Sequence, residues 1–184
     1  MISRLFRLAR LTASLVLVGV ANVQAQAGAV EIPINPKATF LRTQSDPSAV
    51  DTIPIDLAAL GFFPGDIIRL ERLGSFSSTT GLSGSQTGIA AVFSSSGALG
   101  ANNIINRVSG AIDAGTDVST PPTQVGNLTT NITQDFAVAD VEIMVPLNGS
   151  YLFVSPIDRF FGDNTDAGFK VRISKIVSGV IITS

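Results

Sequence analysis

Oxygen-bearing side chains are concentrated in one short segment near the end of the sequence. Four of them fall within nine residues: Asp158, Asp163, Asn164 and Asp166. Calcium takes about six to eight oxygen ligands from carboxylates, amides, backbone carbonyls and water. Three carboxylates so close together repel one another, and a divalent cation would relieve that repulsion. The segment is therefore a candidate calcium site. The alternative is a solvated turn, because Asp, Asn, Thr and Gly are also the usual turn formers.

Composition excludes most other kinds of site. The chain has no cysteine and no histidine, which rules out disulfides, thiol nucleophiles, zinc sites built from Cys and His, haem ligation by these residues and Ser-His-Asp triads. No nucleophile elbow, phosphate-binding loop or dinucleotide fingerprint occurs. Pairs of carboxylates can hydrolyse glycosides, but only at a defined separation that a sequence does not give. We therefore expect a protein that is not an enzyme.

The first 27 residues have the pattern of a secretory signal peptide. Arg4, Arg7 and Arg10 make the start positive, and residues 11–20 form an apolar run. Ala25-Gln26-Ala27 then gives the small-x-small pattern of a cleavage site. We expect cleavage after Ala27, with Ala25 as the second choice. The alternative is a membrane anchor, but the apolar run is shorter than the roughly 20 residues that span a bilayer. No transmembrane segment is then expected in the remaining chain, 28–184, which has the length of a single domain.

Removal of the signal peptide makes the chain acidic. Residues 1–27 contain three arginines and no acid, so 12 basic residues become 9 against 14 acidic ones, a net charge of −5. An acidic surface repels phosphate backbones, so nucleic acid is not an expected partner. An exported chain without cysteine indicates a secreted or periplasmic bacterial protein that depends on its core for stability.

The predicted elements are strands and turns. Gly and Pro total 26 residues and cut the chain into short pieces, which favours β architecture. Expected strands are 50–57, which Pro54 marks as an edge or a bulge, 67–73, 88–93, 103–108, 141–147, 150–155 and 169–177. Along 67–73 we expect Ile68 and Leu70 on one face of the strand and Ile67 on the other. Along 169–177 the alternation predicts two faces: Phe169, Val171, Ile173 and Ile176 inward, and Lys170, Arg172, Ser174 and Lys175 outward. The predicted fold class is therefore all-β, an antiparallel β-sandwich of about eight strands in one domain, 28–184.

Three connections have their own signals. Phe63-Pro64-Gly65-Asp66 is typical of a tight turn. Asn148-Gly149 between two apolar runs predicts a hairpin. The segment 110–135 is rich in Thr, Asp, Gly and Pro, and we expect it to be a long irregular connection.

Several phrases resemble a known group of proteins. Pro64-Gly65-Asp66-Ile67-Ile68 at the start of a strand, and Gly162-Asp163-Asn164 shortly before Phe169-Lys170-Val171-Arg172-Ile173, resemble the calcium-dependent galactose-binding lectins of bacteria. The wider resemblance, over about residues 50–176, is to galactose-binding-like jelly-roll domains of secreted bacterial proteins. The resemblance implies a jelly-roll sandwich that binds calcium.

The resemblance also implies roles for particular residues. Asp158 would correspond to the Asp before the final loop, and Asp163 with Asn164 to the adjacent pair inside it. Backbone carbonyls would come from near Phe161 and from near Ser77 or Ser78. Two departures weaken the galactose assignment: the first Asp is closer to the pair than in the lectins, and their sugar-contacting His and Gln have no counterpart here.

The expected function combines these observations. We expect a secreted calcium-binding module that binds carbohydrate or another extracellular surface component beside the calcium site, with Phe160 as a platform on which a sugar ring stacks. The alternative is a structural or self-assembling protein of the cell surface or matrix, in which calcium only makes a loop rigid. The sequence is compatible with an oligomer. Low charge and high mean hydropathy keep that alternative open.

Overall fold

A computed structural model describes residues 25–41, 49–78, 86–99, 105–108, 123–125, 128–130 and 132–177. For 25–27, 123–125, 128–130 and Asp166 it describes the backbone alone. Nearly all of this chain is β structure; the exception is a short 3-10 turn, η1 (Ala58–Leu60), which ends at Gly61 with a φ of 83°. None of the described helical structure has the length and apolar character needed to cross a membrane.

Four strands form the first sheet. Their order across the sheet is β1 (Ala25–Pro33), β13 (Thr165–Val177), β5 (Ile67–Ser77) and β11 (Asp140–Met144), and every neighbouring pair is antiparallel. β5 follows the predicted alternation, because Ile68 and Leu70 are buried while Ile67 is exposed. One face of this sheet therefore packs on the core and the other faces solvent.

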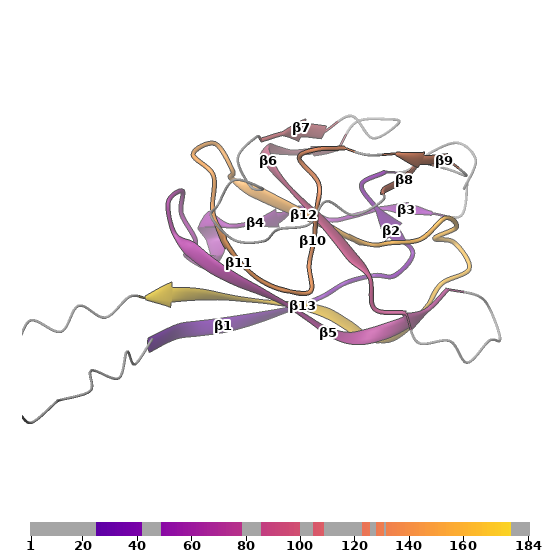
Figure 1. Cartoon of the computed structure of the whole chain (residues 1–184), viewed down its shortest axis with the longest axis horizontal. Helices are drawn as coiled ribbons and strands as arrows, with labels where there is room; N and C mark the ends of the chain where they lie inside the picture. Colours follow the sequence, from indigo (N-terminus) through magenta and orange to yellow (C-terminus); the bar gives the residue numbers. More distant parts are fainter. Residues whose placement is uncertain are drawn as a thin grey trace, which may run out of the picture.

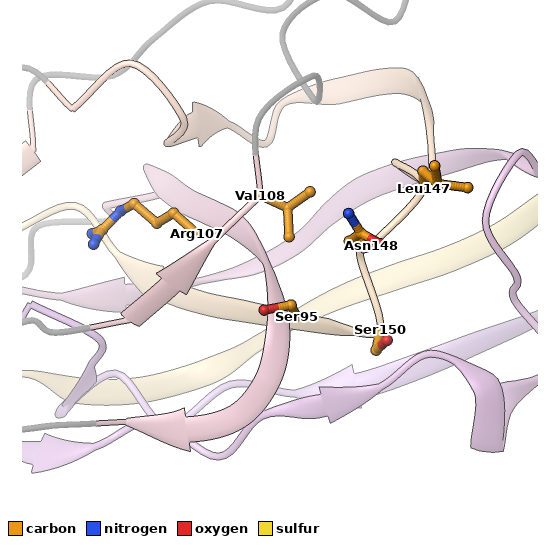
Figure 2. A pocket seen from close by; sticks show the side chains of 6 residues that line it. All are labelled: Ser95, Arg107, Val108, Leu147, Asn148 and Ser150. Carbon is orange, nitrogen blue, oxygen red and sulfur yellow. The ribbon is translucent and has the colours of Figure 1, made fainter.

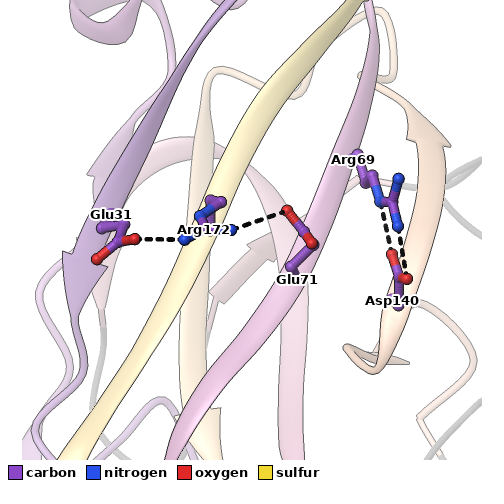
Figure 3. Close-up of polar contacts among 5 residues, drawn as sticks. All are labelled: Glu31, Arg69, Glu71, Asp140 and Arg172. Carbon is purple, nitrogen blue, oxygen red and sulfur yellow. Dashed lines mark hydrogen bonds and ion pairs between the residues drawn. The ribbon is translucent and has the colours of Figure 1, made fainter. Parts of the chain in front are cut away.

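The solvent face of the first sheet carries ion pairs that join neighbouring strands (Figure 3). Arg172 of β13 contacts Glu31 of β1 at 2.6 Å and Glu71 of β5 at 3.8 Å. Arg69 of β5 makes a bidentate contact with Asp140 of β11, with both N···O distances at 2.7 Å. Hydrogen bonds from Arg172 and from Lys170 lower the pKa of Glu31. These contacts are exposed to solvent, so they specify the pairing of the strands more than they stabilise the fold.

The centre of the second sheet, β12 and the first half of β6, is buried on both faces. Its order is β10 (Phe136–Ala137), β6 (Ile89–Leu99), β12 (Tyr151–Pro156) and β4 (Ile55–Asp56), and β7 (Ile105–Arg107) also pairs with β6. Its inner face packs on the core, and a second cluster covers the outer face, formed by Phe40, Leu41, Ala90, Val92 and Phe153. Burial on both faces explains why β6 and β12 read as continuous apolar runs.

The two sheets have the topology of a jelly roll (Figure 1). Eight strands make up the two four-stranded orders given above, with β7 left aside. If these strands are numbered 1 to 8 along the chain, the first sheet has the order 1-8-3-6 and the second has the order 5-4-7-2. Such a double winding of antiparallel strands is the jelly-roll arrangement. The predicted fold class, an all-β antiparallel sandwich of about eight strands, is confirmed.

Aromatic residues fill the space between the sheets. Phe76 of β5 and Phe169 of β13 lie with ring centroids 4.9 Å apart, and Phe93 stacks on Phe136 at 5.6 Å. All four are essentially without exposure. Two smaller units complete the fold: β2 (Ala38–Thr39) pairs in parallel with β3 (Val50–Asp51), and β8 (Thr123–Val125) pairs with β9 (Leu128–Thr130).

The predicted hairpin at Asn148-Gly149 is wrong. β11 belongs to the first sheet and β12 to the second, so this turn carries the chain between sheets. The N–H of Gly149 donates to the carbonyl of Pro146 at 2.8 Å, which puts the glycine at the last position of the turn. A Cβ there would lie 2.8 Å from Cγ of Pro146, so the glycine is needed for close packing rather than for a left-handed backbone.

Other boundaries also differ from the sequence analysis. The expected strand 50–57 is split into β3 and β4, although Pro54 does precede an edge strand as predicted. The segment 110–135 is not wholly irregular, because it contains the β8–β9 hairpin; residues 109–122, 126–127 and 131 lie outside the described chain. Residues 1–24 of the proposed signal peptide also lie outside it. The expected cut after Ala27 falls within β1 and would leave the pairing of Val30–Pro33 with β13 intact.

Candidate functional site

The segment singled out in the sequence is the connection between β12 and β13, at one end of the sandwich (right side of Figure 1). Hydrogen bonds fix both ends of this connection. At its start, the N–H of Ile157 donates to the carbonyl of Gly88 at 2.9 Å. At its end, Thr165 pairs with Ser77, the last residue of β5. The predicted calcium site covers 158–166, but Thr165 and Asp166 already belong to β13. We call the remaining residues, 158–164, the calcium loop, after that prediction.

A pair of glycines shapes the ribbon that carries the calcium loop. Gly74 of β5 and Gly168 of β13 both have positive φ, at 67° and 77°, and the register between the strands shifts between Ala167 and Lys170. A Cβ on Gly74 would lie 2.1 Å from the carbonyl oxygen of Gly168. Only glycine at position 74 allows the two backbones to approach so closely. This irregularity separates the regular sheet from the short pairing of 75–77 with 165–167 that leads into the loop.

Asp158 is a half-buried carboxylate with one unsatisfied oxygen. Its Oδ1 accepts a hydrogen bond from the N–H of Arg159 at 2.6 Å, whereas its Oδ2 is buried without a hydrogen-bond partner. Burial raises the pKa of Asp158 above its ordinary value, and the charge of Asp163 acts in the same direction. The N–H of Arg159, the Asn164 side chain and the N–H of Phe160 oppose this shift. The two carboxylates therefore lie close enough to repel each other.

Asn164 is fully buried and is held from two sides. Its Nδ2 donates to the carbonyl of Pro36 at 2.8 Å, and its N–H donates to the carbonyl of Phe161 at 3.2 Å. The first contact fixes the amide orientation, because Oδ1 is then the atom turned away from Pro36. That oxygen is buried and accepts no hydrogen bond. A buried amide oxygen without a partner costs about 1–3 kcal/mol in free energy unless something satisfies it.

The remaining predicted ligands have different surroundings. Asp163 is partly exposed and its Oδ1 is buried. The side chain of Asp166 lies outside what the structure describes; its backbone pairs with Phe76 in the ribbon. Ser77 ends β5 directly beside the loop, and Ser78 follows it, so the part of the chain expected to supply a carbonyl does lie next to the calcium loop.

The two phenylalanines of the loop have opposite environments. Phe161 is 4% exposed and packs into the domain, while its carbonyl accepts the hydrogen bond from Asn164. Phe160 is 46% exposed. Of the two, only Phe160 has an exposed ring, and its role as a sugar platform stays a prediction.

The calcium loop brings together buried side-chain oxygens that accept no hydrogen bond. Within the described residues, four buried side-chain oxygens lack hydrogen-bond partners, and three of these belong to Asp158, Asp163 and Asn164. The fourth, the hydroxyl of Ser174, lies in β13. Carboxylate and amide oxygens are the ligands of a hard cation such as calcium. Among the described residues, no group of three or more His, Cys, Asp or Glu side chains gathers anywhere. The oxygens described here come from two carboxylates, Asp158 and Asp163, and one amide, Asn164.

Sequence reasoning missed a buried ion pair between Arg107 of β7 and Asp135, which directly precedes β10; both of these strands pair with β6. Asp135 is fully buried and accepts hydrogen bonds from Nε and one terminal nitrogen of Arg107, at 2.9 Å and 3.5 Å. Burial raises the pKa of Asp135, although the guanidinium beside it opposes that shift. The partners are 28 residues apart. No local motif joins them, so only the fold brings them together.

Beside this ion pair lies a shallow pocket of about 630 Å³, shown in Figure 2. Its lining is mostly polar, from Ser95, Asn148 and Ser150, with Val108 and Leu147 as apolar members. Figure 2 shows the Arg107 side chain directed away from the other five. The pocket therefore presents neutral hydroxyl and amide groups rather than the charge of the arginine.

Comparisons of this chain with models of protein families, with curated proteins and with solved structures found no match. The resemblance to galactose-binding lectins thus remains a prediction based on short motifs.

Proposed function

We propose that this protein is a secreted, non-enzymatic calcium-binding module that binds carbohydrate or another extracellular ligand beside the calcium loop. One observation carries the proposal: the loop buries the Oδ2 of Asp158 and the Oδ1 of Asn164 with no hydrogen-bond donor for either. Folded proteins rarely leave such atoms unsatisfied, and an unseen ion is one established explanation. The repulsion between Asp158 and Asp163 supports the same explanation, because a divalent cation would offset it.

The ligand set fits calcium better than magnesium. Two carboxylates and an amide leave several of calcium's coordination positions to backbone carbonyls, to water and to a ligand. Magnesium demands a tight octahedron and gives up its water reluctantly. When bound, calcium would supply open coordination positions that two neighbouring hydroxyls of a sugar can occupy. The exposed ring of Phe160, in the same loop, would then give the sugar an apolar surface.

A glycan array tests the carbohydrate part of the proposal. Wild type should retain one class of glycan in calcium and release it in chelator. Phe160→Ala should weaken that binding while calcium still binds, and Phe63→Ala is the matched control because Phe63 is also exposed, at 52%, but lies in another turn. A glycan signal that is equal in calcium and in chelator would contradict ligand binding through the metal.

A second candidate function rests on a different observation. Ile67 and Met144 are paired across β5 and β11, and both are exposed, at 40% and 44%. Phe63 and Leu147 lie in the two turns at the same end of these strands and are also exposed. We call these four residues the apolar end. Contiguous exposed apolar side chains are typical of interaction surfaces, so the alternative is a structural protein that assembles through this end.

A further inference from the structure

A cavity of about 590 Å³ opens on the side of the sandwich where β1 and β4 form the edges of the two sheets. The described residues that line it come from the end of β1 and the residues that follow it, from β3 and β4, and from η1. The residues of the calcium loop are not among them. Sites for small organic ligands have volumes of about 300–1,000 Å³ and a mostly apolar surface. This cavity has both properties.

The floor of the cavity is continuous with the core of the protein. Ile34 and Ile55 line it and belong to the main core cluster, with 7% and 8% exposure. Ile32 and Leu60 also line it and pack against the same cluster. An aliphatic group in the cavity would exchange water for contacts with these side chains, which is favourable by the hydrophobic effect.

Hydrogen bonds to neighbouring strands hold the walls of the cavity apart. In one wall, the hydroxyl of Thr52 donates to the carbonyl of Val154 in β12 at 2.8 Å, and its N–H donates to the carbonyl of Thr39 at 3.3 Å. In the other wall, the N–H of Ile34 donates to the carbonyl of Phe169 in β13 at 2.9 Å. Each wall is thus fixed to its own sheet, so the cavity is formed before any ligand binds.

A proline lies in each wall, which limits what can occupy the cavity. Pro33 ends β1 and Pro54 directly precedes β4, and both line the cavity. Since Ile34 donates to β13, the alternation of an antiparallel ladder turns the Pro33 position towards the open edge. Proline has no N–H to donate to a strand added at either edge. A peptide strand would therefore lose hydrogen bonds here, whereas a ligand held by apolar contacts needs none.

We infer that this cavity is a second binding site, for a small uncharged ligand with an aliphatic body. The aliphatic body lies on the floor residues, where a charged group would be strongly disfavoured. The hydrophobic effect supplies the affinity, so binding does not depend on the charge of Asp51 and Asp56, which also line the cavity. The site shares no described side chain with the calcium loop, so it goes beyond the proposed function and is independent of calcium.

Titration calorimetry with straight-chain alcohols tests the ligand class. Hexan-1-ol, heptan-1-ol and octan-1-ol are titrated below their solubility limits, each in calcium and in chelator. Wild type should bind one octan-1-ol per chain in both buffers, and each added methylene from hexanol to octanol should tighten binding about fourfold. Octane-1,8-diol should bind at least about fivefold more weakly than octan-1-ol, because its second hydroxyl would enter the apolar floor without a hydrogen-bond partner.

Two matched pairs of variants test the location. Ala59→Phe fills the cavity and should weaken octan-1-ol binding at least about tenfold, whereas Ala58→Phe should not change it, since Ala58 is a neighbouring exposed alanine outside the described lining. Ile53→Asp places a charge beside the entering chain and should weaken binding at least about threefold. Leu147→Asp is its control, because the two side chains are almost equally exposed, at 84% and 83%, and only Ile53 lines the cavity.

Several results would overturn the inference. They are the absence of saturable binding, an affinity that does not rise with chain length, equal binding of the diol and octan-1-ol, a requirement for calcium, and unchanged binding by Ala59→Phe. If Ala59→Phe does not melt cooperatively, the second pair decides: equal affinity of Ile53→Asp and Leu147→Asp overturns the inference. A dimer in solution that Ile53→Asp dissociates would also overturn it, because a second copy would then cover the cavity.

Discussion

At the scale of single residues, the members of the calcium loop divide into two kinds. Asp158 and Asp163 are acids whose mutual repulsion the fold tolerates. Asn164 is a buried amide that joins the loop to the segment carrying Pro36 through a hydrogen bond 2.8 Å long. The two acids would contribute only to binding a cation, whereas Asn164 would bind the cation and also stabilise the fold.

This division predicts opposite behaviour in calcium-free buffer. Asp158→Ala should be no less stable than wild type, because it removes a charge that repels Asp163. Asn164→Ala should be less stable than wild type, because it leaves the carbonyl of Pro36 without its donor. The loss should be below the full cost of an orphaned carbonyl, about 1–3 kcal/mol, because the substitution also removes the unsatisfied Oδ1 of Asn164. Urea denaturation in chelator measures both. Equal destabilisation of the two variants would contradict the distinction.

The buried pair of Arg107 and Asp135 predicts a pH dependence. Burial raises the pKa of Asp135 in the folded state, so folding favours the protonated carboxyl. The stability that this protonated group contributes is complete below the ordinary pKa of an Asp, about 3.9. It is lost as the pH rises through the raised pKa. In Asp135→Asn the side chain at position 135 does not titrate, and Arg107 has a neutral amide as its partner in place of the carboxyl group. The stability advantage of wild type over Asp135→Asn should therefore shrink as pH rises from about 4 towards 7. Urea denaturation of both proteins across this range measures the difference; an advantage that grows with pH would show that the guanidinium outweighs burial.

Residue types alone singled out the loop for which calcium is predicted, but they gave no sign of the ion pair between Arg107 and Asp135. Asp158, Asp163 and Asn164 are neighbours in sequence, so composition alone identified them as a group. Arg107 and Asp135 are distant in sequence, and nothing local distinguishes them from surface charges. The burial of Asn164 and its contact with Pro36 were equally inaccessible, because the partner lies 128 residues away.

At the scale of elements, alternation of apolar residues predicted the strands more reliably than it predicted their partners. The buried positions Ile68 and Leu70 of β5 were correctly placed on one face. Ser174 was expected to face solvent but is fully buried, because exposure depends on what covers a strand as well as on its alternation. The turn at Asn148-Gly149 was correctly located, yet its role was wrong. A turn signal does not say whether the next strand stays in the same sheet.

The glycine pair in the β5–β13 ribbon, Gly74 and Gly168, allows a matched test of how closely the two strands must approach. Gly74→Ala should cost several kcal/mol, about 1–2 from the left-handed backbone and more from the clash with the Gly168 carbonyl. Gly168→Ala meets the backbone cost alone, about 1–2 kcal/mol, since nothing lies within 4 Å of its added Cβ.

Urea denaturation of the two variants measures the difference, and Gly74→Ala should be the less stable by at least about 1 kcal/mol. Because Gly74 shapes the ribbon that leads to the calcium loop, Gly74→Ala should also weaken calcium binding. Equal stability of the two variants would show that the close approach of the strands relaxes without cost.

At the scale of the whole molecule, β5 connects two ends of different character. Its last residue, Ser77, lies beside the calcium loop, and its first residue, Ile67, belongs to the apolar end. The sequence predicted a sandwich because all its segments are short and strand-like. The interleaved strand order of a jelly roll could not follow from the residues alone, since it depends on which distant strands pair. The family resemblance implied it.

The apolar end predicts a measurable effect on association. Ile67→Ser with Met144→Ser should make the protein more monomeric at high concentration if this end mediates assembly, because both exposed apolar side chains are removed. Light scattering coupled to gel filtration, over a concentration series with and without calcium, measures the mass. Val50→Ser is the control, since Val50 is similarly exposed, at 43%, but lies on β3, which pairs with β2 outside the two main sheets. If the mass of wild type matches one chain at every concentration, the alternative of a structural protein that assembles through the apolar end is wrong.

Titration calorimetry of calcium into wild type, Asp158→Ala and the control Asp140→Ala is the most direct test of the calcium loop. Asp140 is also an acid, but it lies on the edge strand β11, where it pairs with Arg69. Wild type and Asp140→Ala should each bind one calcium ion per chain, and Asp158→Ala should bind none, because it loses a charged ligand. Bound calcium at a hundredfold excess over Kd should also raise the unfolding free energy of wild type by about 2.7 kcal/mol. No heat of binding in wild type, or calcium binding by Asp158→Ala equal to wild type, would contradict the account.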